Sequence, residues 1–252
     1  MKLFIKIKYD GTRYAGYQVQ NNALTIQEVL NNALADLFGF ECDLTGCSRT
    51  DSGVHAMCFC ATVQKHGESS LQTNIPCEKI PYALNFRLPA DISVYDAAWV
   101  DDDFHARYSV VSKTYEYHIL NTQFKDPFFV NRAYHYSKML TDSDLSRMQS
   151  AAELICGKYD FSSFMASGSS VKDTTRTVYD CKVFRKNEEV IINITADGFL
   201  YNMVRIISVT LLEVGKGSIS PEQILSIIMS KDRSLAGPTL PAHGLYLANV
   251  AY

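Results

Sequence analysis

The chain has 252 residues, of which 47% are hydrophobic and 20% charged, with a net charge of −3. This length suits one large domain or two halves that share a cleft, and the composition is that of a soluble globular protein. No apolar run is long enough to cross a bilayer, and the negative net charge lends no support to a nucleic-acid ligand, although it leaves room for a local basic groove.

The cysteines and the first residues bear on the compartment. The seven cysteines are scattered without a Cys-x-x-Cys pair, which argues against a zinc site and favours free thiols in a reducing compartment. The opening residues, Met1 to Lys8, alternate in polarity like a strand, whereas a signal peptide would be continuously apolar. We therefore expect a cytoplasmic protein without a metal centre.

The first third of the chain predicts a strand, a helix and a second strand. Leu3, Ile5, Ile7 and Tyr9 alternate with polar residues, as in a half-buried strand. A Thr25-x-x-Glu28 capping box then opens a helix with apolar residues at helical spacing, which Gly39 ends; Cys58 to Val63 is again strand-like.

Between that helix and the second strand lies a polar loop, Ser48 to Ala56. Its Asp51 is two residues from Arg49, so its charged form is favoured; Gly53 permits unusual backbone geometry and His55 can titrate near neutrality. An ionised aspartate here has four possible roles: nucleophile, base, metal ligand or structural cap of a turn.

The later elements follow the same rules. We expect a short strand at 92–94, a strand at 111–120, a polar helix from about Thr141 and a hairpin around 186–189. Apolar residues from Met203 to Val214 form one face of a helix ended by Gly215, and a last helix is expected to start at Ser220.

Five motifs together resemble the tRNA pseudouridine synthase A family. The loop matches its G-R-T-D-A-G-V-H-A signature, with Ser48 in place of glycine and Ser52 in place of alanine. The other four motifs follow in the family's order. Residues 104–108, F-H-A-R-Y, resemble F-H-A-R-F; residues 113–117 match K-x-Y-x-Y; residues 197–205 resemble N-G-F-L-x-x-M-V-R with Asp197 in place of asparagine; and residues 244–247 match G-L-Y-L. A further segment, 9–20, is similar except that Tyr17 replaces a tryptophan.

The resemblance implies an α+β pseudouridine synthase fold. Two similar halves, each an antiparallel sheet with helices on one face, would meet at a central cleft. We expect residues 1–103 to carry the catalytic aspartate loop and residues 104–252 the stacking tyrosine and the arginine helix, with one active cleft shared between them.

The implied activity is isomerisation of uridine to pseudouridine at positions 38 to 40 of the tRNA anticodon stem-loop, without a cofactor. Asp51 takes the place of the catalytic nucleophile and Tyr115 that of the tyrosine stacking on the base. Arg49 would fill the space of the flipped base or hold phosphate, Arg205 would pair with the aspartate, and Leu245 would pack against the base. Residues implied to contact the RNA are Phe104, His105, Ala106, Arg107, Tyr108 and Arg13.

The family also implies a homodimer in which both subunits hold one tRNA. Two alternatives remain open. One is a paralogue that binds or remodels tRNA without catalysis, and the other is an unrelated carboxylate-dependent enzyme acting on a nucleoside or phosphate ester. Against the second, no other acidic residue lies near Asp51 in the sequence and no glycine-rich phosphate loop appears.

Overall fold

The computed structural model describes residues 1–169 and 171–252. The chain forms two compact units, one made of Met1–Val111 with Leu247–Tyr252 and the other of Ser112–Tyr246. The unit boundaries differ from the expected halves, because the segment from residue 104 and the chain's last residues belong to the first unit. Within the described residues, no helix is long and apolar enough to span a membrane.

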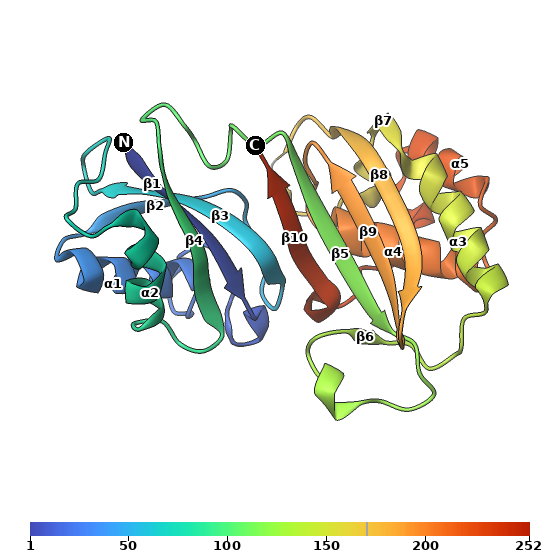
Figure 1. Ribbon diagram of the computed structural model, residues 1–252. Helices are drawn as coiled ribbons and strands as arrows, with labels where there is room; N and C mark the ends of the chain where they lie inside the picture. The colour runs from blue at the N-terminus through green and yellow to red at the C-terminus, as the bar shows by residue number, and fades with distance from the viewer. Residues whose placement is uncertain (170) are drawn as a thin grey trace. The chain divides into compact units, whose positions relative to one another are not determined.

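The first unit is an antiparallel sheet with two helices. Its strands are β1 (Lys2–Tyr9), β2 (Cys42–Gly46), β3 (His55–Lys65) and β4 (Ile92–Val100), in the order β4-β1-β3, with β2 paired to β3. β10 (Leu245–Ala251) also lies beside β3. Figure 1 shows α1 (Ile26–Phe38) and α2 (Ile80–Asn85) next to each other on this unit.

The sequence pattern explains why β1 and α1 form where they do. Leu3, Ile5 and Ile7 are fully buried, which confirms the expected apolar face of the first strand. At the start of α1, the Thr25 side chain accepts a hydrogen bond from the Glu28 backbone N–H, so one of the unpaired amides of the first turn is satisfied. Gly39 ends the helix in the left-handed conformation, at φ 76°.

Among the described residues, the second unit has a mostly antiparallel sheet and three α-helices. Its strands β5 (Ser112–Leu120), β9 (Glu189–Ala196), β8 (Thr175–Lys186) and β7 (Gly157–Asp160) pair in that order, and the short β6 (Tyr134–His135) runs parallel to β5. The helices are α3 (Asp142–Ile155), α4 (Met203–Gly215) and α5 (Gln223–Ser230), which pack on the strands and on one another (Figure 1). The expected α+β class is confirmed, as are the β8–β9 hairpin and the α3 and α4 helices.

Two expected elements begin or end elsewhere. The strand expected at 92–94 extends to Val100 because it pairs with β1 along its whole length. A register shift between Lys6 and Ile7 of β1 places an extra residue in β4 and interrupts the alternation of its side chains, so the sequence pattern does not show the full strand. The last helix begins at Gln223 rather than near Ser220. There the Gln223 side chain accepts from the Ser220 backbone N–H at 2.7 Å, whereas Ser220 itself does not cap the helix.

Helix α4 is more deeply buried than its expected single apolar face. Eleven of its residues are buried, including Ser208 and Thr210. The Thr210 hydroxyl donates to the Ile206 carbonyl at 2.8 Å and accepts from the Gly237 N–H at 3.1 Å. This pairing lets a polar side chain occupy the interior.

Candidate active site

The loop that carries Asp51 connects β2 to β3 and begins where the regular hydrogen-bond pairing of these two strands ends. The Cys47 N–H donates to the Cys60 carbonyl at 2.8 Å, which extends the β2–β3 pairing up to the loop. At the other end, the Val54 N–H donates to the Asp51 carbonyl at 3.1 Å, and Gly53 takes the left-handed conformation at φ 77°. The Asp51 side chain is half-buried on a closed turn, so the backbone beneath the carboxylate is fixed.

Residues from the start of the chain hold this loop in place. The Tyr17 N–H donates to the Thr50 carbonyl at 3.1 Å, and the Thr50 and Tyr9 hydroxyls lie 2.8 Å apart in a buried hydrogen bond. On the other side of Asp51, the Ser52 hydroxyl donates to the Tyr14 carbonyl at 3.2 Å. The serine that replaces the family's alanine therefore adds an anchor to the loop.

Two glycines permit this close approach. A Cβ on Gly11 would lie 2.0 Å from the Val54 carbonyl oxygen, and one on Gly16 would lie 2.6 Å from the Thr50 carbonyl oxygen. Gly16 also has a φ of 92°, which other residues rarely adopt. These two glycines of the segment 9–20 are thus required by contact with the Asp51 loop.

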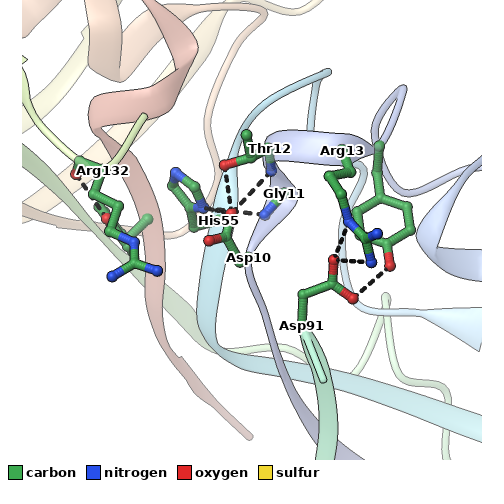
Figure 2. A network of polar contacts seen from close by, with 9 residues as sticks. Asp10, Gly11, Thr12, Arg13, His55, Asp91 and Arg132 are labelled. Carbon is green, nitrogen blue, oxygen red and sulfur yellow. Dashed lines mark hydrogen bonds and ion pairs between the residues drawn. The ribbon is translucent and has the colours of Figure 1, made fainter. Parts of the chain in front are cut away.

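His55 has a structural place at the base of the loop. It is 2% exposed, and its Nδ1 accepts the Gly11 N–H at 3.0 Å (Figure 2). An acceptor nitrogen carries no proton, so we interpret its 3.2 Å approach to the Asp10 carboxylate as proximity rather than a hydrogen bond. Asp10 itself accepts from the N–H and hydroxyl of Thr12 and caps the turn that follows β1.

Arg13 belongs to a separate paired network on the same unit. Its Nε and Nη2 donate to Asp91 Oδ2 at 2.7 and 2.6 Å, and the Tyr14 hydroxyl donates to Asp91 Oδ1 at 2.7 Å (Figure 2). Burial and the bond to Asp91 raise the pKa of Tyr14 to about 12. The expected RNA contact of Arg13 stays a prediction, now for a guanidinium that already has a carboxylate partner.

The expected RNA-binding segment 104–108 is fastened to the first unit at its two apolar residues. The Phe104 ring contacts the rings of Phe4 and Tyr252 at 5.5 and 5.0 Å between centroids. Ala106 is fully buried, and its carbonyl accepts the Tyr252 hydroxyl at 2.7 Å. These contacts explain why residues 104–111 belong to the first unit and identify Phe104 and Ala106 as the anchors of the segment.

The three remaining residues of this segment line a cavity together with Arg49. The cavity, of about 170 Å³, is here called the Tyr17 cavity; its lining includes Tyr17, Arg49, His105, Arg107 and Tyr108. The Tyr108 ring is 78% exposed and lies 4.3 Å from the His105 ring. The structure thus brings together four residues that the sequence places in two motifs more than fifty positions apart.

In the second unit, the expected stacking residue lies on β5. Tyr115 is 7% exposed, and its ring meets the Phe199 ring edge-on at 5.0 Å. The other tyrosine of the motif, Tyr117, is fully buried and donates its hydroxyl to the Pro241 carbonyl at 2.8 Å. Tyr117 therefore has the place of a core aromatic with a satisfied hydroxyl.

Arg205 and Leu245 lie on different elements of the same unit. Arg205, in the first turn of α4, donates from Nε to the Leu240 carbonyl and from Nη1 to Asn202 Oδ1, both at 2.6 Å. Asn202 precedes the helix in the left-handed conformation. Leu245 begins β10 and is 7% exposed. The guanidinium of Arg205 is thus oriented by its own unit, and its pairing with Asp51 stays a prediction.

Two features of the first unit were not identified from the sequence. Asp91, the partner of Arg13 and Tyr14, follows Pro89 and Ala90 without any motif that singles it out. The second feature is the Tyr17 hydroxyl: the sequence shows Tyr17 only as a replacement for the family's tryptophan and assigns no role to its hydroxyl. Among the residues that the structure describes, no group of three or more His, Cys, Asp and Glu side chains could hold a metal ion.

Comparison with known proteins identifies the family. The family model described as tRNA pseudouridine synthase matches residues 5–109 and 151–252. A tRNA pseudouridine synthase A of Thermoanaerobacter sp. (strain X514) is 47% identical, with 99% of each chain covered. The enzyme of the same name from Caldicellulosiruptor saccharolyticus is 46% identical, also with 99% of each chain covered, and that of Bacillus subtilis is 44% identical, covering 100% of this chain and 99% of its own. The chain belongs to the tRNA pseudouridine synthase family.

Proposed function

We propose that the protein isomerises uridine to pseudouridine in tRNA, at positions 38 to 40 of the anticodon stem-loop. The observation that carries this proposal is the full-length similarity to tRNA pseudouridine synthase A together with an intact and rigidly held Asp51 loop. We further propose that the enzyme acts in the cytoplasm as a homodimer, as the family resemblance implies.

The reaction defines what the residues must do. The bond between N1 of uracil and the anomeric carbon breaks, the base turns while it is held, and C5 bonds to the same carbon. C5 then loses its hydrogen as a proton and N1 gains one, so the isomerisation needs neither oxidant nor reductant. The target base must first leave the stack, which costs roughly a few kcal/mol and is cheapest in a loop.

Asp51 is the proposed catalytic residue. Its carboxylate attacks the anomeric carbon or C6 of the base, or removes a sugar proton to give a glycal; these three routes remain open. The support for Asp51 is its half-buried position on a turn anchored by Tyr9, Tyr14 and Tyr17, because a fixed backbone limits the conformations of the carboxylate.

The other proposed residues hold the base and the RNA. Tyr115 stacks on the uracil and Leu245 packs against it, while Arg205 keeps Asp51 ionised. Tyr115 and Arg205 are supported by their fixed orientation, through Phe199 and through Leu240 respectively.

Four of the proposed RNA contacts of the first unit line the Tyr17 cavity. Arg49 holds phosphate or fills the space of the flipped base. His105, Arg107 and Tyr108 contact the RNA, carried by Phe104 and Ala106, and Arg13, which pairs with Asp91, adds a separate contact.

The test is single-nucleotide mapping of pseudouridine in an unmodified tRNA transcript, with wild-type protein and the Asp51→Ala variant. We expect pseudouridine within positions 38 to 40 with the wild type and none with the variant. If neither protein forms pseudouridine although both bind the tRNA equally, the catalytic proposal fails, and a tRNA-binding paralogue without catalysis takes its place.

A further inference from the structure

The Tyr17 cavity is lined by hydrogen-bond donors and by no acidic residue. Its charged lining groups are Arg49 and Arg107, and the rest are neutral polar or apolar residues and His105. A cavity with two guanidinium groups and no carboxylate in its lining attracts an anion. Because guanidinium pairs with phosphate in a fork geometry, phosphate is the anion that this lining suits best.

Neither guanidinium is paired within the part of the protein that the structure describes. Among the described residues, Arg49 and Arg107 form no side-chain hydrogen bond or ion pair, whereas Arg13, Arg87 and Arg147 each have a carboxylate partner within 2.7 Å. Arg49 is exposed and Arg107 half-buried. Two unpaired arginines that share one cavity indicate a site for a ligand charge rather than a structural network.

Tyr17, which lines this cavity, carries a third donor that has no partner among the described residues. The Tyr17 side chain is 2% exposed and stacks on Phe59 at 4.3 Å, and its hydroxyl has no hydrogen-bond partner among residues 1–169 and 171–252. A Cβ on Gly46, which also lines the cavity, would lie 2.7 Å from Tyr17 Cζ, the carbon that bears the hydroxyl. A buried hydroxyl without a partner costs about 1–3 kcal/mol, so its position requires an explanation.

His105 supplies a fourth donor. Its Nδ1 accepts the backbone N–H groups of Arg107 and Tyr108 at 3.1 and 3.3 Å. With Nδ1 used as an acceptor, the proton of the neutral ring is on Nε2, so the histidine also offers an N–H. The same two bonds fix the segment that carries Arg107.

We infer that the Tyr17 cavity binds one phosphate diester of the substrate RNA, through Arg49 and Arg107, and that the Tyr17 hydroxyl is a further donor to this phosphate. The inference rests on the proposed function and deepens it. Arg49 and Asp51 are two residues apart and span at most about 7 Å of chain, so the phosphate belongs to a nucleotide at or next to the reacting uridine. Tyr17 is therefore a binding residue that helps to place the target nucleotide.

The test compares the wild type with Tyr17→Phe, which removes only the hydroxyl. We expect the Kd for unmodified tRNA to rise roughly tenfold, because a hydrogen bond to a charged group is lost. The melting temperature of the free protein should stay the same or rise, because an unsatisfied buried hydroxyl disappears. An unchanged Kd overturns the inference, and so does a lowered melting temperature with unchanged Kd, which would assign the hydroxyl to folding.

A double-mutant cycle tests whether Tyr17 and Arg107 share the phosphate. Arg107→Gln should raise the Kd about tenfold, and the double variant should raise it clearly less than the product of the two single effects. The matched control is Arg87→Gln, since Arg87 is paired with Asp36 at 2.6 Å and lies outside the cavity. Effects that multiply fully in the double variant contradict a shared phosphate.

Two further measurements distinguish failure of this inference from failure of the proposed function. Inorganic phosphate in a thermal-shift titration probes a free small anion. If it stabilises the wild type but not Tyr17→Phe while both bind tRNA equally, the cavity is a small-anion site and the RNA assignment is overturned. Pseudouridine formation by the wild type is measured in parallel, so normal activity with an unchanged Tyr17→Phe Kd rejects this inference alone.

Discussion

The two charged networks of the first unit differ in what their charges contact. Around Asp91, the Arg13 guanidinium and the Tyr14 hydroxyl meet one carboxylate (Figure 2). Around the Tyr17 cavity, Arg49 and Arg107 have no such partner among the described residues. The two sets of charges lie on the same unit, so the difference indicates different roles. The Arg13–Asp91 pair stabilises the fold even if Arg13 also contacts RNA, whereas the unpaired guanidinium groups of Arg49 and Arg107 are available to bind the ligand.

The largest effect is expected from a substitution in the backbone that supports the Asp51 loop. Gly11→Ala should destabilise the protein by about 3 kcal/mol or more, because its Cβ would overlap the Val54 carbonyl oxygen and displace the Asp51 loop. Gly39→Ala is the matched control. It has no atom within 4 Å of the new Cβ and suffers only its positive φ, so about 1 kcal/mol is expected. Urea unfolding measures both, and equal losses would refute the close contact as the cause.

The salt dependence of tRNA binding tests whether the unpaired arginines contact phosphate. Arg49→Gln should lower the slope of log K against log salt by about 0.7 to 0.9, the effect of one lost phosphate contact. Arg87→Gln, in which the lost charge was already paired with Asp36, should leave the slope unchanged. A slope that falls equally in both variants would show that pairing does not distinguish the two classes of arginine.

A paired charge in the second unit should have its effect on stability alone. Burial lowers the pKa of His118, but hydrogen bonds from its ring to Glu116 and Glu189, at 3.1 and 2.9 Å, outweigh burial and raise it. The bond to His118 lowers the pKa of Glu116. A raised histidine pKa contributes stability that is complete below its unfolded value, near 6.5, and is lost as pH rises through the folded value.

The resulting prediction is a small, pH-dependent one. The free energy of unfolding should decline as pH rises above about 6.5, and His118→Gln should remove most of this decline while leaving tRNA affinity unchanged. Urea unfolding between about pH 5 and 9 measures this decline in the wild type, in His118→Gln and in the control variant His66→Gln. His66 pairs with Asp43 at an exposed site. A decline that persists in His118→Gln would assign the pH dependence to another group.

Elements with strong local signals could be predicted from the sequence. Helix α1 follows from helical spacing between Thr25 and Gly39, and the β8–β9 hairpin from its alternating strands. The strand predicted for β4 is too short, because the bulge places two successive exposed residues, Tyr95 and Asp96, in the strand and breaks the alternating pattern. Its true length depends on pairing with β1, which no local pattern records.

The candidate site was predictable as a set of motifs but not as an arrangement. The resemblance supplied Asp51, Arg49 and the 104–108 segment, but the cavity that gathers Arg49 with Arg107 depends on long-range packing. In the same way, nothing near Arg13 in the sequence indicates Asp91, which lies 78 residues away. Tertiary contacts decide which charges are paired, so they also decide which remain for the ligand.

The most direct test of this account separates turnover from binding. Single-turnover release of the hydrogen at C5 of uridine, at saturating tRNA, is measured for the wild type, Asp51→Asn and Arg107→Gln, together with each Kd. We predict that Asp51→Asn loses at least about 10³-fold in rate with an unchanged Kd, on the scale of losing a catalytic group. Arg107→Gln should keep its rate within a few-fold while its Kd rises. Substantial turnover by Asp51→Asn, or a lost rate with normal affinity in Arg107→Gln, would contradict the account.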